Sequence, residues 1–251
     1  MTKLRSFDFI GKIYKTKKSG DCFVVDFKNS ENITVMFYDG YLSRVNHYNL
    51  KSGNIRNPFY HKNLFCGVGV TDISGSTDGV VDKEYRTWRN MISRCYNENL
   101  RRVNKAYEDC SVSDSWLLYS NFKKDVGNMV GVDCEDYHLD KDILVKGNRV
   151  YSKETCVFVP REINNALTKS NCARGKYPIG VKKSSDSGYI ARVSVFGEDK
   201  YLGSFKTPEQ AFLEYKTAKE SYLKDLAEKW GGVVDHRVYK ALVDYKVEIT
   251  D

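Results

Sequence analysis

The strongest candidates for chemistry lie in one short segment, the run His138-Leu139-Asp140-Lys141-Asp142. In an extended strand, side chains two residues apart point to the same face. His138, Asp140 and Asp142 would therefore share a face, and Lys141 would lie on the other. Two carboxylates on one face could hold a divalent metal ion. The same charges could also form a solvated surface strip, and the sequence leaves both interpretations open.

Simple spacing rules indicate the elements around these residues. The segment from Tyr137 to Asn165 is typical of a strand, a tight loop, and then a helix or a second extended segment. Gly147 and Asn148 mark the loop, and Pro160 closes the run. This layout would place the acidic residues on a strand that leads into the loop.

Composition favours a polyanionic partner. The chain has 251 residues, a net charge of +7 and 18 tyrosines, a residue type that suits half-buried strands and stacking on bases. Its seven cysteines include no CxxC pair, which favours reduced thiols in a cytoplasm. No apolar run is long enough to cross a membrane, and Met1 to Arg5 lack signal-peptide character. From the cysteines and the absence of a long apolar run, we therefore expect a cytoplasmic protein with no membrane partner.

Two polar stretches divide the chain. The segment Ser74–Gly79 is small and polar in composition, and the segment Thr168–Lys176 is polar and basic. The pattern predicts an α+β protein. Its expected parts are a small N-terminal antiparallel β module at 1–76, a central module at 80–168, a C-terminal sheet-and-helix module at 177–232 and an extension at 233–251.

The N-terminal module shows short apolar runs separated by turn signals. This pattern is typical of a compact antiparallel sheet or a small barrel, with strands expected over 22–27 and 33–38. One turn holds Lys15, Lys17 and Lys18. These lysines could contact phosphate or could simply be solvated, and the sequence favours the second interpretation.

A helix is predicted over residues 83–97 of the central module. Trp88, Ile92 and Cys95 recur there at three- and four-residue steps, which indicates an apolar face. The opposite face is basic and carries Arg86, Arg89 and Arg94. These arginines could contact a DNA backbone or form a solvated charged face, and the sequence favours neither.

The C-terminal module has the clearest pattern in the chain. Residues 189–195 alternate strictly between the two faces of a strand, and strands are also expected over 180–183 and 200–205. Thr207 and Gln210 then fit the start of a helix. An apolar stripe along that helix would cover one face of the sheet.

The central module resembles a phage-borne branch of the HNH homing endonucleases. The resemblance covers about half the chain and rests on the order Trp88-x2-Met91-x2-Arg94-Cys95-Tyr96-Asn97, Leu139-Asp140-Lys141-Asp142-Ile143, Gly147-Asn148, Tyr151-Ser152 and Thr155-Cys156. It implies a ββα-metal finger that acts on double-stranded DNA. It also implies Mg²⁺ as the cofactor, with Mn²⁺ as a substitute.

The resemblance assigns roles residue by residue. Asp140 matches the metal-binding acid of the family, and Asp142 could assist it. Asn148 or Thr155 stands near the usual asparagine ligand. In such a site the metal stabilises the departing oxygen of the phosphodiester, which is a poor leaving group.

The general base is the point at which the chain departs from the family. Lys141 stands where the family has its catalytic histidine, and lysine is charged at neutral pH unless strongly buried. His138 is the other candidate for the base, although strand alternation places it on the opposite face from Lys141. The catalytic candidates are therefore His138, Asp140 and Lys141.

The C-terminal module resembles the ethylene-response-factor (APETALA-type) DNA-binding domain. The resemblance rests on Gly180-Val181 and on the runs 201–205 and 207–211. In that family, a three-stranded sheet enters the major groove and its exposed face meets bases and phosphates. The resemblance implies a set of DNA-contacting residues, namely Lys182, Lys183, Arg192, Ser194, Lys200 and Tyr201.

Three functions follow from these patterns. The favoured one is a phage-type relative of HNH homing endonucleases that binds double-stranded DNA, and nicks or cuts it with a divalent metal, in the cytoplasm of a bacterial host. The second is a catalytically inactive DNA-binding protein on the same scaffold, which Lys141 motivates. The third is a phage anti-defence protein that binds a host protein or its nucleic acid.

Overall fold

The computed structural model describes residues 9–168, 176–185 and 188–251. The residues Met1 to Arg5, most of the expected linker at 168–176 and part of the connection between the strands expected over 180–183 and 189–195 lie outside the described residues. The described chain contains both helices and strands, which confirms the α+β class. Within this part of the chain, no helix is long and apolar enough to cross a membrane.

The chain forms two compact units, residues 1–124 and residues 125–251. The division falls inside the segment 80–168, which the sequence patterns group as one module. The expected module boundaries therefore stay predictions, and the two units are described in turn.

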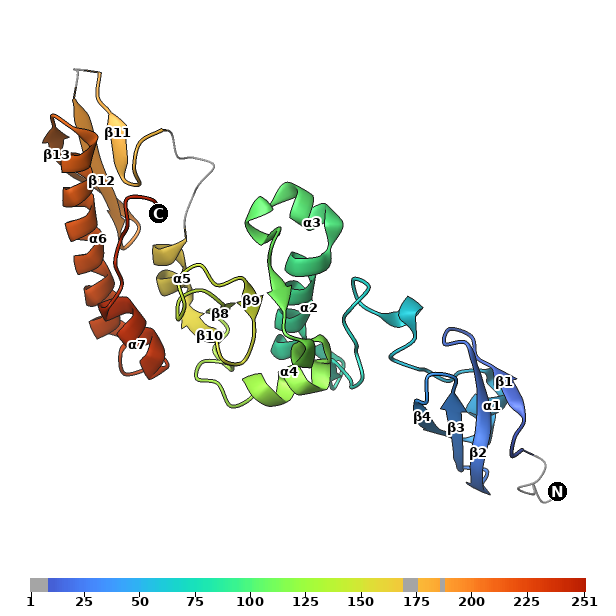
Figure 1. Cartoon of the computed structure of the whole chain (residues 1–251). Coiled ribbons are helices and arrows are strands. Elements are labelled where there is room, and N and C mark those ends of the chain that lie inside the picture. Colours follow the sequence, from blue (N-terminus) through green and yellow to red (C-terminus); the bar gives the residue numbers. More distant parts are fainter. Residues whose placement is uncertain (1–8, 169–175, 186–187) are drawn as a thin grey trace. The chain divides into compact units, whose positions relative to one another are not determined.

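The first unit begins with a four-stranded antiparallel sheet in the order β1–β2–β3–β4 (Figure 1). The elements are β1 (Ile13–Lys15), β2 (Asp21–Asn29), β3 (Asn32–Phe37) and β4 (Leu42–Val45), followed by α1 (His47–Ser52). Alternate residues of β2 and β3 point inward, and Cys22, Val24, Ile33, Val35 and Phe37 are buried. The expected antiparallel β module is confirmed, and it forms a sheet with its own core.

The rest of the first unit is mainly helical. Its elements are η2 (His61–Asn63), β5 (Ser76–Thr77), β6 (Val80–Val81), α2 (Lys83–Tyr96), α3 (Glu98–Val103), η3 (Lys105–Tyr107), β7 (Ser111–Val112), η4 (Asp114–Leu117) and α4 (Tyr119–Val126). Helix α2 confirms the helix predicted over 83–97. Trp88 and Trp116 are fully buried, and the Trp88 indole donates a hydrogen bond to the Trp116 carbonyl oxygen at 2.7 Å.

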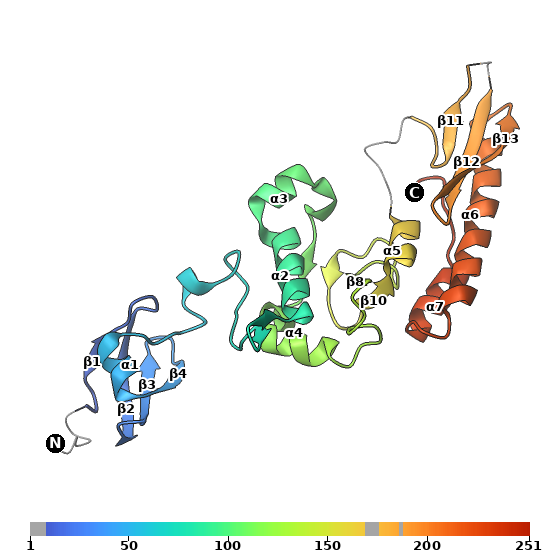
Figure 2. The ribbon, with the colours of Figure 1, turned by 180° about the vertical axis from the view of Figure 1, so that it is seen from behind.

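The second unit contains two small sheets and a long helix (Figures 1 and 2). β8 (Tyr137–Asp140) and β10 (Val157–Pro160) form the first sheet, with β9 (Val150–Tyr151) between them in the chain and α5 (Arg161–Leu167) after them. β11 (Val181–Lys183), β12 (Tyr189–Val195) and β13 (Glu198–Phe205) form the second. The helices α6 (Pro208–Trp230) and α7 (His236–Val243) follow. The expected C-terminal sheet and helix are confirmed.

Helix α6 begins and ends where the local sequence predicts. The Thr207 side chain accepts a hydrogen bond from the backbone N–H of Gln210, and Pro208 occupies the first turn, where its missing N–H costs nothing. The helix ends at Trp230, immediately before a pair of glycines, which are poor helix formers.

The N-terminal part of α6 covers the three-stranded sheet. Phe212 and Tyr215 pack with Ala191 and Val193 of β12 in one buried cluster. Gly180 lies against the Tyr215 ring so closely that an added Cβ would come within 2.0 Å of it. Only glycine permits this approach, and the positive φ of 77° at Gly180 favours glycine as well.

The C-terminal part of α6 builds a different core. Leu223 and Leu226 pack with Val159 of β10, Ile163 of α5 and Val238 of α7, and all five are fully buried. The apolar residues of α6 recur at three- and four-residue steps along its whole length. One helix therefore packs against both the β8–β10–α5 segment and the three-stranded sheet.

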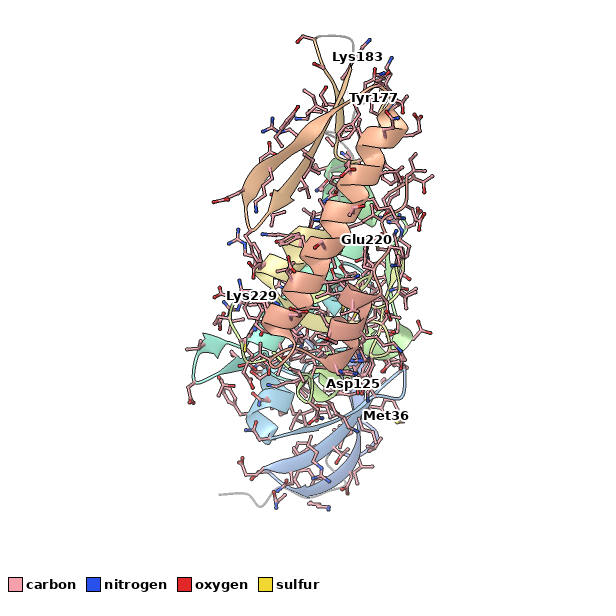
Figure 3. The ribbon with its side chains drawn as sticks, turned by 90° about the vertical axis from the view of Figure 1, so that its left-hand side faces the viewer. Met36, Asp125, Tyr177, Lys183, Glu220 and Lys229 are labelled. Atoms are coloured by element: carbon pink, nitrogen blue, oxygen red, sulfur yellow. The ribbon has the colours of Figure 1, made fainter. Side chains whose placement is uncertain are left out.

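Polar contacts also connect α6 to helix α5 and to the C-terminal segment of the chain. Lys229 pairs with Glu162 of α5 at 2.8 Å, and the indole of Trp230 donates to the same carboxylate at 2.7 Å. Closer to the middle of the helix, the Glu220 carboxylate accepts the backbone N–H of Val247 at 2.9 Å. Figure 3 labels Glu220 and Lys229 along this helix.

Truncating the shared core of α6 should destabilise the second unit. The change Leu226→Ala removes a fully buried side chain, so we expect the free energy of unfolding to fall by about 2–5 kcal/mol. The matched control is Leu213→Ala on the same helix, because Leu213 is 59% exposed and should cost much less. Urea unfolding followed by circular dichroism checks both. Equal losses would contradict the core assignment.

Candidate acidic site and nucleic-acid interface

The acidic site lies at the end of strand β8. In the antiparallel pairing with β10, Asp140 lies opposite Val157 and His138 lies opposite Val159. Helix α5 follows β10 directly, so the order is strand, loop, strand and helix. The strand ends at Asp140, and Asp142 lies in the bend that follows. The predicted alternation therefore holds for His138 and Asp140 but was wrong for Asp142.

Asp140 closes this bend with its own side chain. Its Oδ1 accepts the backbone N–H groups of Asp142 at 2.8 Å and of Ile143 at 2.9 Å, an arrangement that aspartate favours in turns. Burial, followed by the nearby Asp142 charge, raises the pKa of the Asp140 carboxyl to about 6. The two N–H donors act in the opposite direction but do not cancel the effect of burial.

Lys141 is buried, with 8% of its surface exposed. Its Nζ lies 3.4 Å from Asp142 Oδ1 and 5.9 Å from the centre of the Tyr151 ring. The interpretation of Lys141 as a solvated surface charge is therefore wrong. Its ammonium group lies near both a carboxylate and an aromatic ring, two kinds of group that attract a cation.

The loop after Lys141 is held by two polar side chains. The Asn148 amide donates to the carbonyl oxygens of Lys141 and Val150, both at 2.7 Å, and its Oδ1 accepts the Val150 N–H at 3.3 Å. The Thr155 hydroxyl also donates to the Val150 carbonyl, at 2.9 Å. The two residues expected near the asparagine ligand therefore fix the loop.

The oxygen atoms that could meet a metal ion here belong mainly to Asp140 and Asp142. A magnesium ion needs only one or two carboxylates from the protein, because it keeps several of its waters. His138 is exposed on the same face of β8 as Asp140. Within residues 9–168, 176–185 and 188–251, no three His, Cys, Asp or Glu residues gather closely enough to hold a metal ion.

The second candidate site is a set of residues on the three-stranded sheet that we call the outer face: Lys182, Arg192, Ser194, Asp199 and Tyr201. Residues directly opposite across a ladder share a face, and the register places Arg192 beside Tyr201 and Ser194 beside Asp199. Lys182 lies one row further along. Tyr201 is 57% exposed. The opposite face of the sheet packs against α6.

Two of the expected DNA-contacting lysines do not share the outer face. Lys183 lies opposite Tyr189, and Lys200 lies opposite Val193. Both partners pack into the core under the sheet, so the two lysines belong to the rows that point toward α6. Both lysines remain exposed at the margins of the sheet.

Arg192 is already paired within the protein. Its Nε donates to Asp199 Oδ2 at 2.8 Å, a contact that the sequence patterns did not predict. The turn between β12 and β13 lies at Phe196 and Gly197, both with positive φ, so β13 begins at Glu198 and not at residue 200 as the sequence analysis placed it. The two-residue turn sets the register, and a correct turn assignment would have placed Asp199 near Arg192.

The three arginines of α2 all lie outside the buried face of the helix. The guanidinium carbon of Arg89 lies 4.3 Å from the centre of the Phe65 ring, and that of Arg94 lies 5.6 Å from the Tyr107 ring. Arg86 is exposed. Two of the three cationic groups are thus held against aromatic rings of their own unit.

Comparisons with protein-family models, curated proteins and solved structures gave no match to this chain. The resemblances to HNH endonucleases and to the ethylene-response-factor domain therefore stay predictions. A functional assignment must rest on the acidic site and the outer face as described above.

The raised pKa of Asp140 predicts a pH dependence of stability. Below the ordinary value of 3.8 the acid is protonated in both states, and its stabilising contribution is complete. That contribution is lost as pH rises through about 6, where the folded carboxyl ionises. Relative to Asp140→Asn, which has no proton to lose, the wild-type melting temperature should fall across this interval.

Thermal unfolding in a buffer series measures this difference. A useful second variant is Asp142→Asn, because removing the neighbouring charge should lower the pKa of Asp140 and move the fall to lower pH. Parallel melting curves for wild type and Asp140→Asn at every pH would contradict the assignment.

Proposed function

We propose that the protein binds double-stranded DNA through the outer face of its C-terminal sheet. The observation that carries the proposal is the pair Arg192 and Tyr201, side by side on the face that α6 leaves open. Arginine hydrogen-bonds to base edges and to phosphates, so this face offers direct contacts with a duplex.

The shape of the sheet supports the proposal. β12 and β13 have 7 and 8 residues, so the paired strands extend for about 25 Å. The major groove, about 12 Å wide, admits a two-stranded ribbon of this kind. Because α6 closes the opposite face, the ribbon is supported from behind and presents one surface to a partner.

The charge distribution supports the same orientation. The chain carries a net charge of +7, which favours a polyanion. Lys182 lies on the outer face, whereas Lys183 and Lys200 are exposed at its margins. Lysines at the margins of the sheet can contact phosphates and so position the sheet on the duplex, while residues on the outer face meet the bases. The setting that fits such a protein is the cytoplasm of a bacterial host.

The pairing of Arg192 with Asp199 predicts opposite effects of two substitutions. Arg192→Ala removes a donor to DNA and should weaken duplex binding about tenfold. Asp199→Asn removes a negative charge from the outer face and frees the guanidinium group, so it should strengthen binding. Fluorescence anisotropy with a labelled duplex measures both affinities.

The matched control is Lys224→Ala, which removes one positive charge from the exposed side of α6. It should change the duplex affinity much less than Arg192→Ala does. If Arg192→Ala binds DNA as tightly as wild type, the outer face is not the docking surface.

We infer a second candidate function for the acidic site, namely metal-dependent hydrolysis of a phosphodiester bond in DNA. The supporting observation is a carboxylate pair, Asp140 and Asp142, at the end of the first strand of a strand–strand–helix segment. Bound Mg²⁺ would stabilise the charge that develops on the leaving oxygen. His138 lies exposed on the face of Asp140 and is the better base candidate, because Lys141 is paired with Asp142.

Cleavage is tested on supercoiled plasmid with Mg²⁺ or Mn²⁺. We expect metal-dependent conversion to nicked or linear plasmid by the wild type and its loss in Asp140→Ala, with duplex affinity unchanged. Asp133→Asn, which neutralises an exposed acid before β8, is the control and should cleave normally. Cleavage by Asp140→Ala at the wild-type rate would contradict the metal assignment.

The same pair of assays separates the remaining alternatives. Duplex binding without cleavage at any divalent metal concentration would indicate a DNA-binding protein on an inactive scaffold. Absence of both signals would overturn both proposals and direct attention to a host or defence protein as the partner.

A further inference from the structure

A basic pocket lies in the N-terminal sheet module, outside both sites described above. Its volume is about 580 Å³. The lining residues come from the turn after β1 and from the segment after α1, and they are Lys17, Lys18, Ser19, Gly53, Asn54, Ile55, Arg56 and Asn63. The lining holds three cations, and no acid is among these eight residues.

The cations of the pocket have no carboxylate partners among the residues that the structure describes. No hydrogen bond or ion pair of the Lys17, Lys18 or Arg56 side chains occurs within the described part of the chain, and all three residues are exposed. The nearest acid in the surrounding hydrogen-bond network is Asp39, which accepts from Asn57 Nδ2 at 2.8 Å. Three neighbouring like charges repel one another, so an anion between them would stabilise the folded protein.

The backbone that carries these cations is held in place. The Lys17 N–H donates to the Gly53 carbonyl oxygen at 2.9 Å, which joins the two walls of the pocket. The backbone at Gly53 has a φ of 67°, and an added Cβ would lie 2.7 Å from the Lys15 carbonyl oxygen. Only glycine permits this approach. The turn itself is closed by Thr16, whose hydroxyl donates to the Gly20 carbonyl at 2.7 Å.

Ser19 forms the polar floor of the pocket. Its side chain is almost fully buried, and its Oγ accepts hydrogen bonds from Asn57 N at 3.0 Å and Asn63 Nδ2 at 3.1 Å. Among the described residues, no acceptor is found for the Ser19 hydroxyl proton, which is therefore able to bind an anion. Asn54 lines the same space.

We propose that this pocket binds a phosphate group of a nucleic-acid backbone. The chemistry is that of phosphate recognition, because lysine, arginine, serine and asparagine residues line the pocket and no acidic residue is among them. The proposal rests on the proposed function in one respect, which is the choice of nucleic acid as the source of the phosphate. It adds a second contact with the nucleic acid, made by the first unit. This contact would be with the backbone and would not depend on the base sequence.

The test compares two double variants of the full-length chain. Lys17→Gln/Lys18→Gln removes two cations from the pocket. Lys12→Gln/Lys28→Gln removes two exposed lysines of the same module that do not line the pocket. Duplex affinity is measured by anisotropy over a series of salt concentrations. Each lost phosphate contact should make the salt dependence shallower by about 0.9, so the pocket variant, which loses one phosphate, should lose about 0.9 from the slope and the control much less.

A titration with pyrophosphate, followed by backbone amide shifts, identifies the source of the phosphate. We expect shifts at Lys17, Ser19, Asn54 and Arg56 in wild type and none in the pocket variant. Pyrophosphate binding at these residues with an unchanged duplex slope would assign the pocket to a free phosphate compound and overturn the backbone proposal. No shift and an unchanged slope would overturn the pocket itself.

The outcomes also separate this proposal from the proposed function. Suppose that the wild type binds duplex DNA, that Arg192→Ala binds it more weakly and that the pocket variant binds it normally. The pocket proposal is then wrong and the proposed function stands. If the wild type binds no duplex, a single-stranded oligonucleotide decides: binding that depends on Lys17 and Lys18 supports the pocket, and absence of binding overturns both.

Discussion

The burial of one long helix, α6, organises the whole second unit. Its N-terminal part buries Phe212 and Tyr215 under the three-stranded sheet, and its C-terminal part buries Leu223 and Leu226 under the β8–β10–α5 segment. The two-stranded β8–β10 sheet would be marginal alone, and both sheets gain a buried face by packing against the helix. The helix thereby fixes the acidic site and the outer face within one framework, and any shift between them would break one of the two cores.

The same burial sets the chemistry of the acidic site. Burial of Asp140 raises the pKa of its carboxyl to about 6 even though two backbone N–H groups favour the ionised form. Lys141 is also buried, and its charge is accommodated by Asp142 and the Tyr151 ring. The arrangement favours an acid that a cation or a proton can neutralise. It disfavours Lys141 as a base, because its Nζ already contacts Asp142 Oδ1.

Local patterns predicted the elements well because they depend on neighbouring residues. The strict alternation in β12, the cap at Thr207 and the apolar spacing around Trp88 each appear in the structure where the sequence placed them. Contacts set by long-range pairing were missed. The salt bridge of Arg192 with Asp199 depends on the strand register, and the contact of Lys141 with the Tyr151 ring depends on the loop that brings residue 151 back to it. The pocket at Lys17 also needs the residues that follow α1. The sequence of the turn does not show that these residues lie beside it.

The most direct test of the account is a titration of the full-length protein with duplex DNA, followed by backbone amide shifts. We predict that the largest changes in the second unit fall on the outer face, at Arg192, Ser194 and Tyr201, while buried α6 residues such as Leu223 keep their shifts. The first outcome would place the duplex on the sheet that α6 supports. Saturable binding with no change in β11, β12 or β13 would contradict the proposed interface.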